Sequence, residues 1–83
     1  MFYTYVLQSL KDTRLYIGHT QDLEKRLQEH NSGKVSSTRR RTPFVLLYTK
    51  EFQTQNEARW QEHQWKTGWG HKQLEKLLNS VPT

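Results

Sequence analysis

The chain has 83 residues, of which 33% are hydrophobic, and its 13 Lys and Arg against 8 Asp and Glu give a formal net charge of +5. This length fits a single domain, residues 1–83, with one small core, and the absence of cysteine excludes a disulfide framework and a thiolate zinc site. No apolar run reaches the length of about 18 residues that spans a membrane, and the polar N-terminus lacks a signal-peptide core, so we expect a cytoplasmic protein without a membrane partner.

The first predicted elements are two strands joined by a hairpin. Residues 2–7 are rich in aromatic and β-branched side chains, residues 9–13 favour a loop, and residues 14–18 form a short second strand, antiparallel to the first. Tyr5 and Tyr16 stand eleven residues apart on these strands, so they can be neighbours on one face of the sheet. Such a pair is most often two core aromatics with satisfied hydroxyls, and a chemical role is less common.

An amphipathic helix follows, with Thr20 as its predicted N-cap and two leucines four residues apart as its buried stripe. Gly33 is the left-handed residue expected to end the helix. Arg26 and His30 share a face at the edge of the leucine stripe, because they are also four residues apart. A guanidinium and an imidazole at the edge of the core can grip a phosphate, although the polar flanks of any half-buried helix give the same pattern.

The whole net charge of the chain lies in residues 34–50. The segments before and after each hold four basic and four acidic side chains, whereas this segment holds five basic side chains and no acid. These are Lys34, Arg39, Arg40, Arg41 and Lys50. Arginine makes forked contacts with phosphate, and nearby serines and threonines add hydrogen bonds to phosphate oxygens. We therefore expect the first four of them to form a loop that binds nucleic acid; a solvated loop with incidental charge is the alternative.

The second half of the chain predicts one strand and two helices. Residues 44–48 form a continuous apolar run, which predicts a strand covered on both faces. Residues 54–57 match a capping box and start a helix, which runs to about residue 66 and stops at the glycines of residues 68–70. A last helix is indicated by apolar side chains at helical spacing, namely Leu74, Leu77, Leu78 and Val81. The order β-β-α-β-α-α predicts an α/β fold with helices packed on a small sheet.

Glu62 is the most informative acid of the chain. It lies four residues after Ala58 and three before Trp65, so it shares the apolar face of its predicted helix. A carboxylate on such a face is costly to bury unless it is paired, protonated or bound to a metal ion. Pairing with Arg26 and an exposed helix end are the alternatives to a metal site. Zinc is not expected, because the four histidines form no helical pair four residues apart.

Several short motifs, in order and in register, resemble one nuclease family. Residues 3–5, Tyr-Thr-Tyr, and residues 15–18, Leu-Tyr-Ile-Gly, are similar to the paired signature of the GIY-YIG endonucleases. Arg26 and His30 stand where such nucleases place an arginine and a histidine on a helix. Residues 57–66 match the helix that supplies the metal-binding glutamate of the family.

The resemblance covers about residues 2–79 and is strongest to the short, single-domain bacterial branch, because residues 27–34 and 38–48 also look alike. It implies an α+β fold in which three helices flank a three-stranded antiparallel sheet. It also implies an endonuclease that hydrolyses phosphodiester bonds with Mg²⁺ or Mn²⁺. The expected partner is nucleic acid, DNA in preference to RNA, and the substrate is expected to be structured or branched DNA in repair or recombination.

The resemblance assigns roles to individual residues. Glu62 would hold the metal ion. Tyr5 and Tyr16 would line the site and activate or orient the attacking water, while Arg26 would neutralise the scissile phosphate. His30 would assist proton transfer or bind phosphate.

The chain also departs from the family pattern. His19, where some relatives carry a lysine, is expected to contact nucleic acid, although it is a weaker candidate than the arginines. The first signature has Tyr3 and Thr4 in place of its glycine and isoleucine. Leucine occupies the position of an asparagine that often follows the glutamate helix, and Asn79 is only a loose substitute.

Two other functions fit the same sequence. The chain could be a module that keeps the nuclease fold and binds nucleic acid without cutting it. It could also be a scaffold for protein interactions, an interpretation that depends on Trp60, Trp65 and Trp69. Turnover of DNA separates the first of these from the nuclease.

Overall fold

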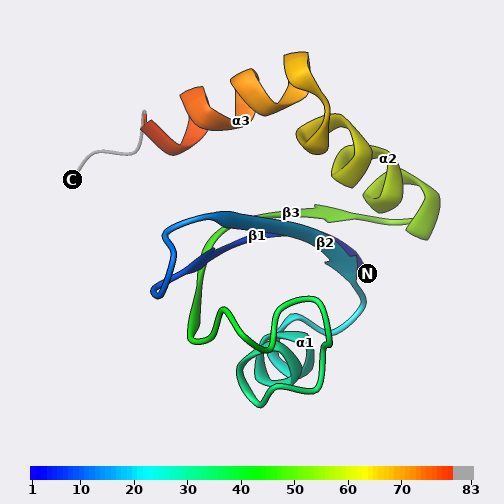
Figure 1. The fold of residues 1–83 in the computed structure, drawn as a ribbon. Helices are drawn as coiled ribbons and strands as arrows, with labels where there is room; N and C mark the ends of the chain where they lie inside the picture. Colours follow the sequence, from blue (N-terminus) through cyan, green and yellow to red (C-terminus); the bar gives the residue numbers. More distant parts are fainter. Residues whose placement is uncertain (80–83) are drawn as a thin grey trace.

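Three antiparallel strands form one sheet with β1 in the centre, in the order β2-β1-β3 (Figure 1). A computed structural model describes residues 1–79. The predicted order β-β-α-β-α-α and the α+β fold are confirmed. The elements are β1 (Phe2–Ser9), β2 (Leu15–Thr20), α1 (Leu23–Asn31), β3 (Phe44–Phe52), α2 (Gln55–Lys66) and α3 (Gly68–Asn79).

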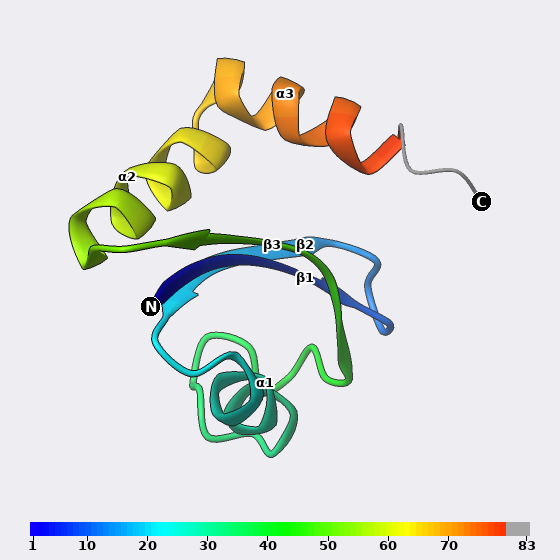
Figure 2. The ribbon, with the colours of Figure 1, turned by 180° about the vertical axis from the view of Figure 1, so that it is seen from behind.

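Helices cover both faces of the sheet. The helices α2 and α3 lie against one face, and α1 with the loop 32–43 lies against the other (Figures 1 and 2). The core beneath α2 and α3 consists of Val6, Ile17, Trp65 and Leu74. The core beneath α1 consists of Tyr5, Leu7 and Phe44, with Tyr16, Leu23 and Leu27 packed against it. Alternate residues of β1 therefore enter different cores, and Tyr5 faces α1.

The prediction that the third strand is covered on both faces is wrong. β3 is an edge strand, and Val45, Leu46 and Leu47 keep 38–40% of their surface exposed. Phe44 at its start is buried and Tyr48 is half-buried, so only some side chains of the strand contribute to the core. An apolar run indicates a strand but does not place that strand within the sheet, and here β1 takes the central position.

The predicted start of the first helix is also corrected. Asp22 is the N-cap of α1, because its Oδ1 accepts the backbone N–H of Lys25 at 3.0 Å. Thr20 lies two residues earlier, and its hydroxyl accepts the N–H of Asp22 at 3.1 Å, so it shapes the turn that leads into the helix. The other end is as predicted, since Gly33 has a φ of +79°.

The last two helices follow each other almost without a loop. The capping box is confirmed, because the Thr54 hydroxyl accepts the N–H of Glu57. α2 ends at Lys66, as predicted, but the glycines of residues 68–70 form no loop: α3 begins at Gly68, and Gly70 lies inside its first turn. A Cβ atom on Gly70 would lie 1.7 Å from the backbone oxygen of Gln64, so the glycine serves the close approach of the two helices. Val81 lies outside the described residues.

None of the helices in residues 1–79 has the length and apolar character needed to cross a bilayer.

Candidate active site

Two phenol rings lie near each other on the α1 face of the sheet. Tyr5 pairs with Gly18 across the β1–β2 ladder, and its ring centroid lies 6.4 Å from that of Tyr16, with 29° between the ring planes. A Cβ atom on Gly18 would lie 2.5 Å from the Tyr5 Oη, so only glycine leaves room for the phenol to lie across β2. The spacing of the two tyrosines in the sequence therefore predicted a real proximity.

His30 lies beneath the two rings and is completely buried. Its Nε2 is 3.0 Å from the Tyr5 Oη, and its ring stands edge-on to Tyr16 with centroids 4.7 Å apart. The other ring nitrogen, Nδ1, is 2.8 Å from the hydroxyl of Thr38. Burial, together with the nearby Arg26 cation, lowers the pKa of His30 to about 4. The imidazole is therefore neutral at pH 7.

Arg26 approaches the same phenol from α1. Its Nε donates to the Tyr5 Oη at 3.4 Å, and its Nη1 lies 3.5 Å from a carboxylate oxygen of Glu29. The hydrogen bond to Tyr5 is the main reason that the pKa of Arg26 lies above its ordinary value. Arg26 therefore carries a permanent positive charge at the edge of the site, where it can stabilise an anion on the phenol or on a ligand.

Glu62 comes from α2, on the opposite face of the sheet. Its Oε1 lies 2.7 Å from the Nδ1 of His19, and its Oε2 accepts a hydrogen bond from the Nζ of Lys66 at 2.8 Å. Burial raises the pKa of Glu62, but the hydrogen bonds from Lys66 and His19 outweigh this effect and hold the pKa below its ordinary value. The group is a carboxylate at neutral pH. It is half-buried and does not pair with Arg26, so that alternative is wrong.

The cluster around Tyr5 and the cluster around Glu62 meet at consecutive residues of β2. Tyr5 lies over Gly18 on the α1 face, and Glu62 contacts His19 from the α2 face. Burial is the main reason that the pKa of Tyr5 lies above its ordinary value, and the negative charge of Glu62 adds to the rise. A hollow of about 340 Å³ opens at this edge of the sheet and is bordered by both His19 and Arg26. A ligand in it would contact both clusters.

The basic loop is only partly available to a ligand. Within residues 1–79, Lys34, Arg39 and Arg40 are exposed and make no ion pair. Arg41 is engaged in the fold, because its Nε lies 2.7 Å from a carboxylate oxygen of Asp12 in the β1–β2 hairpin. The three exposed side chains are therefore the candidates for phosphate contacts.

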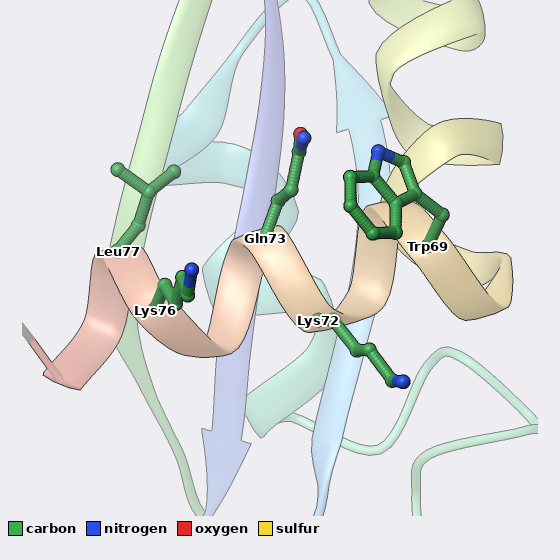
Figure 3. A pocket seen from close by; sticks show the side chains of 5 residues that line it. All are labelled: Trp69, Lys72, Gln73, Lys76 and Leu77. Atoms are coloured by element: carbon green, nitrogen blue, oxygen red, sulfur yellow. The ribbon is translucent and has the colours of Figure 1, made fainter.

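A larger hollow, of about 540 Å³, runs along α3 and contains none of the predicted site residues. Figure 3 shows Trp69, Gln73 and Leu77 projecting from the same side of this helix. Trp69 and Trp60 are exposed, whereas Trp65 is buried in the core. A scaffold surface made of all three tryptophans is therefore wrong.

Comparison with known proteins identifies the family. The family model described as the GIY-YIG catalytic domain matches residues 1–75. This chain belongs to the GIY-YIG family. Membership implies nuclease activity in general, and with it a nucleic acid as substrate.

Similar GIY-YIG chains are UPF0213 proteins. One from Bacillus pumilus is 49% identical over 80 residues, which are 95% of this chain and 80% of the relative. One from Oceanobacillus iheyensis is 45% identical over 65 residues, which are 77% of this chain and 74% of the relative. The solution NMR structure of a UPF0213 protein from Bacillus halodurans is 37% identical, with a TM-score of 0.55, and the alignment covers 93% of this chain and 85% of that one. The fold is therefore shared with a solved structure.

Most of the predicted site residues of this GIY-YIG chain are brought together. Four of them share one cluster on the α1 face, namely Tyr5, Tyr16, Arg26 and His30. Glu62 and His19 form the second. The sequence reasoning missed Lys66 and Thr38. Lys66 was recognisable, because it lies four residues after Glu62 on a helix. Nothing in the pattern pointed to Thr38, since its place depends on the path of a loop.

Glu62 has the chemistry to hold a divalent ion, although it is not part of a larger ligand cluster among the described residues. Within residues 1–79, no group of three or more acidic or histidine side chains could hold a metal ion. Each oxygen of Glu62 has one partner and keeps a second lone pair. One carboxylate completed by water and phosphate oxygens is a usual donor set for Mg²⁺, and carboxylates also suit Mn²⁺. The residues therefore fit such an ion, provided that substrate and water complete its shell.

Proposed function

We propose that this protein is a divalent-metal-dependent endonuclease that hydrolyses phosphodiester bonds in DNA, with structured or branched DNA in repair or recombination as its substrate. The observation that carries the proposal is the meeting of two clusters at one edge of the sheet. A phenol hydrogen-bonded to a cation and a neutral imidazole lies over Gly18, and an ionised carboxylate contacts His19, the next residue.

Arg26 and the exposed loop cations bind the backbone of the substrate. Arg26 borders the hollow and keeps its charge at any physiological pH, so it stabilises negative charge that develops on the phosphate. The loop 32–43 lies on the same side of the sheet as α1 (Figure 1), and its exposed Lys34, Arg39 and Arg40 hold the neighbouring phosphates. Tyr16 packs against Tyr5 and limits the positions that water can take.

Tyr5 moves the proton of the attacking water. Because the pKa of Tyr5 lies above its ordinary value, the phenol stays protonated at neutral pH and is a poor base by itself. It can accept a proton from water only if it releases its own proton at the same time. Tyr5 takes a proton from water on its Oη and gives its own proton to the Nε2 of His30, which is 3.0 Å away and neutral. Because the pKa of His30 is about 4, the imidazolium is short-lived. Once the bond to the leaving oxygen has broken, it returns its proton to the Tyr5 Oη, which releases the proton taken from the attacking water to the solvent, and the leaving oxygen takes up a proton from solvent water.

Glu62 is the residue that would hold the divalent ion. When bound there, Mg²⁺ or Mn²⁺ supplies Lewis-acid stabilisation of the charge on the phosphate and on the leaving oxygen. His19 fixes the orientation of the carboxylate through its Nδ1 and leaves its other nitrogen for the substrate.

The test is cleavage of nicked, flapped and branched DNA with and without Mg²⁺. Glu62→Ala is expected to lower the rate by about 100-fold or more, because a bound metal supplies several kcal/mol of charge stabilisation. Glu51→Ala, at an exposed glutamate on β3, is the matched control and should cleave normally. Cleavage by Glu62→Ala at the wild-type rate would eliminate the metal role. DNA binding by the wild type without any turnover would instead support the non-catalytic binding module.

A further inference from the structure

A buried hydroxyl, that of Thr38, completes the α1-face cluster. Thr38 comes from the loop between α1 and β3, and its side chain is completely buried. Its Oγ1 lies 2.8 Å from the Nδ1 of His30 and 3.4 Å from the carbonyl oxygen of Val35. It therefore contacts the imidazole on the side opposite to Tyr5.

The groups at the two ends of this hydrogen-bond chain favour one direction for the bonds within it. At one end, the guanidinium of Arg26 can only donate, so the Tyr5 Oη accepts from it and keeps its own hydrogen available for the Nε2 of His30, 3.0 Å away. At the other end, the carbonyl of Val35 can only accept, so it offers the Thr38 hydroxyl an acceptor other than the imidazole, at 3.4 Å. The Thr38 oxygen is then left to accept a hydrogen from the Nδ1 of His30. We assign the tautomer of His30 from this network.

We propose that Thr38 is a positioning residue of this nuclease: its hydroxyl holds the hydrogen of His30 on Nδ1 and so keeps Nε2 open to receive the Tyr5 proton. The inference rests on the proposed function, in which Tyr5 passes a proton to His30. With the other tautomer, Nε2 would carry a hydrogen toward Tyr5, and the imidazole could not accept another proton there.

The alternative is that Thr38 only anchors its loop. Other bonds already do this: Asn31 makes two hydrogen bonds with the backbone of Phe44, and the Ser9 hydroxyl donates to the backbone oxygen of Arg41. These bonds do not involve Thr38, so we expect the loop to keep its position when this one hydroxyl is removed. The same loop presents Arg39 and Arg40 to solvent, directly after Thr38 in the sequence. Thr38 thus connects the surface that would contact phosphates to the interior of the site.

The deciding experiment measures the ¹⁵N chemical shifts of the two imidazole nitrogens of His30 at pH 7, which report the tautomer. Cleavage of branched DNA is measured on the same proteins. In the wild type we expect the Nδ1–H tautomer. Thr38→Val keeps the shape but removes the acceptor, so the Nε2–H tautomer should become the major form, and cleavage should fall by about 10- to 100-fold. Thr38→Ser should restore both, and Thr49→Val, at an exposed threonine on β3, should change neither.

Each outcome of this experiment is informative. An Nε2–H tautomer in the wild type overturns the proposal without the use of any variant, even if Thr38→Val fails to fold. Unchanged tautomer and cleavage in Thr38→Val also overturn it, as does a loss of cleavage that Thr38→Ser does not restore. A tautomer shift in Thr38→Val in a protein whose wild type cuts no DNA would support the role of Thr38 and contradict the nuclease proposal.

Discussion

The hydroxyl of Tyr5 is held from three directions. Gly18 provides the space across β2, Arg26 donates a hydrogen bond to the oxygen, and the Nε2 of His30 lies 3.0 Å from it. The main effect of these contacts is to fix the position of one oxygen atom; their contribution to the stability of the core is secondary. At the scale of single residues, the site is therefore sensitive to changes that a globular fold would tolerate elsewhere, because misplacing a reacting atom by about 1 Å can cost about 100-fold in rate.

The glycines of the chain offer a direct test of this sensitivity. Gly18→Ala would place a Cβ atom 2.5 Å from the Tyr5 Oη, so we expect the free energy of unfolding to fall by about 1–3 kcal/mol and the phenol to shift. Gly68→Ala is the control, because a Cβ atom there has nothing within 4 Å. Denaturant titration of both variants measures the difference. Equal stabilities of the two variants would contradict the proposed tight fit over β2.

At the scale of elements, the β1–β2 hairpin holds the basic loop. Lys11 donates from its Nζ to the backbone oxygen of Arg40, and the N–H of Leu10 donates to the backbone oxygen of Pro43. Asp12 pairs with Arg41, whose guanidinium also lies 5.4 Å from the ring centroid of Phe44. The hairpin thus determines where the exposed arginines stand, although it lies at the opposite end of β2 from Gly18.

The Asp12–Arg41 ion pair predicts a pH dependence. The hydrogen bond from Arg41 is the main cause that lowers the pKa of Asp12 from 3.8 to about 2. A carboxyl group whose pKa is lowered on folding stabilises the protein fully above its unfolded pKa and loses that effect as the pH falls through its folded pKa. The wild type should therefore be more stable than Asp12→Asn above about pH 4, and the difference should vanish between pH 4 and 2.

Thermal melts of both proteins across this range measure the effect, with Glu51→Gln, at an exposed acid on β3, as the control. A difference between the wild type and Asp12→Asn that stays constant down to pH 2 would mean that the ion pair does not account for it.

At the scale of the whole molecule, charge is distributed unevenly over the two faces of the sheet. The loop 32–43 lies on the α1 face, whereas α3, which includes Lys72 and Lys76, lies on the other (Figure 2). Because the segments outside residues 34–50 are neutral overall, the field of the protein is expected to attract a polyanion mainly to the α1 face.

Salt dependence tests this placement of the nucleic acid. If Arg39 and Arg40 each contact one phosphate, Arg39→Ala/Arg40→Ala should reduce the slope of log affinity against log salt by about 2. Lys72→Ala/Lys76→Ala removes the same charge from α3 and should leave the slope unchanged. The affinity of duplex DNA measured over a range of salt concentrations distinguishes them. Equal slopes in the two double variants would move the binding surface away from the basic loop.

Local patterns in the sequence determined the elements and half of the candidate site. The alternation of strands placed Tyr5 and Tyr16 on one face, and the helical period placed Arg26 and His30 together, because both periods act over a few residues. The capping box at Thr54 was readable for the same reason, and the net charge of the basic loop could be counted directly.

Only the tertiary structure decided how these parts meet. It placed the apolar strand β3 at the sheet edge, paired Arg41 with Asp12, and brought Glu62 to His19 from the opposite face. Thr38 is the clearest case, since its burial against His30 follows from the path of a loop with no period of its own. The sequence alone therefore determined which groups the protein carries, and packing between distant segments decided which of them share a site, because such contacts leave no repeating local pattern.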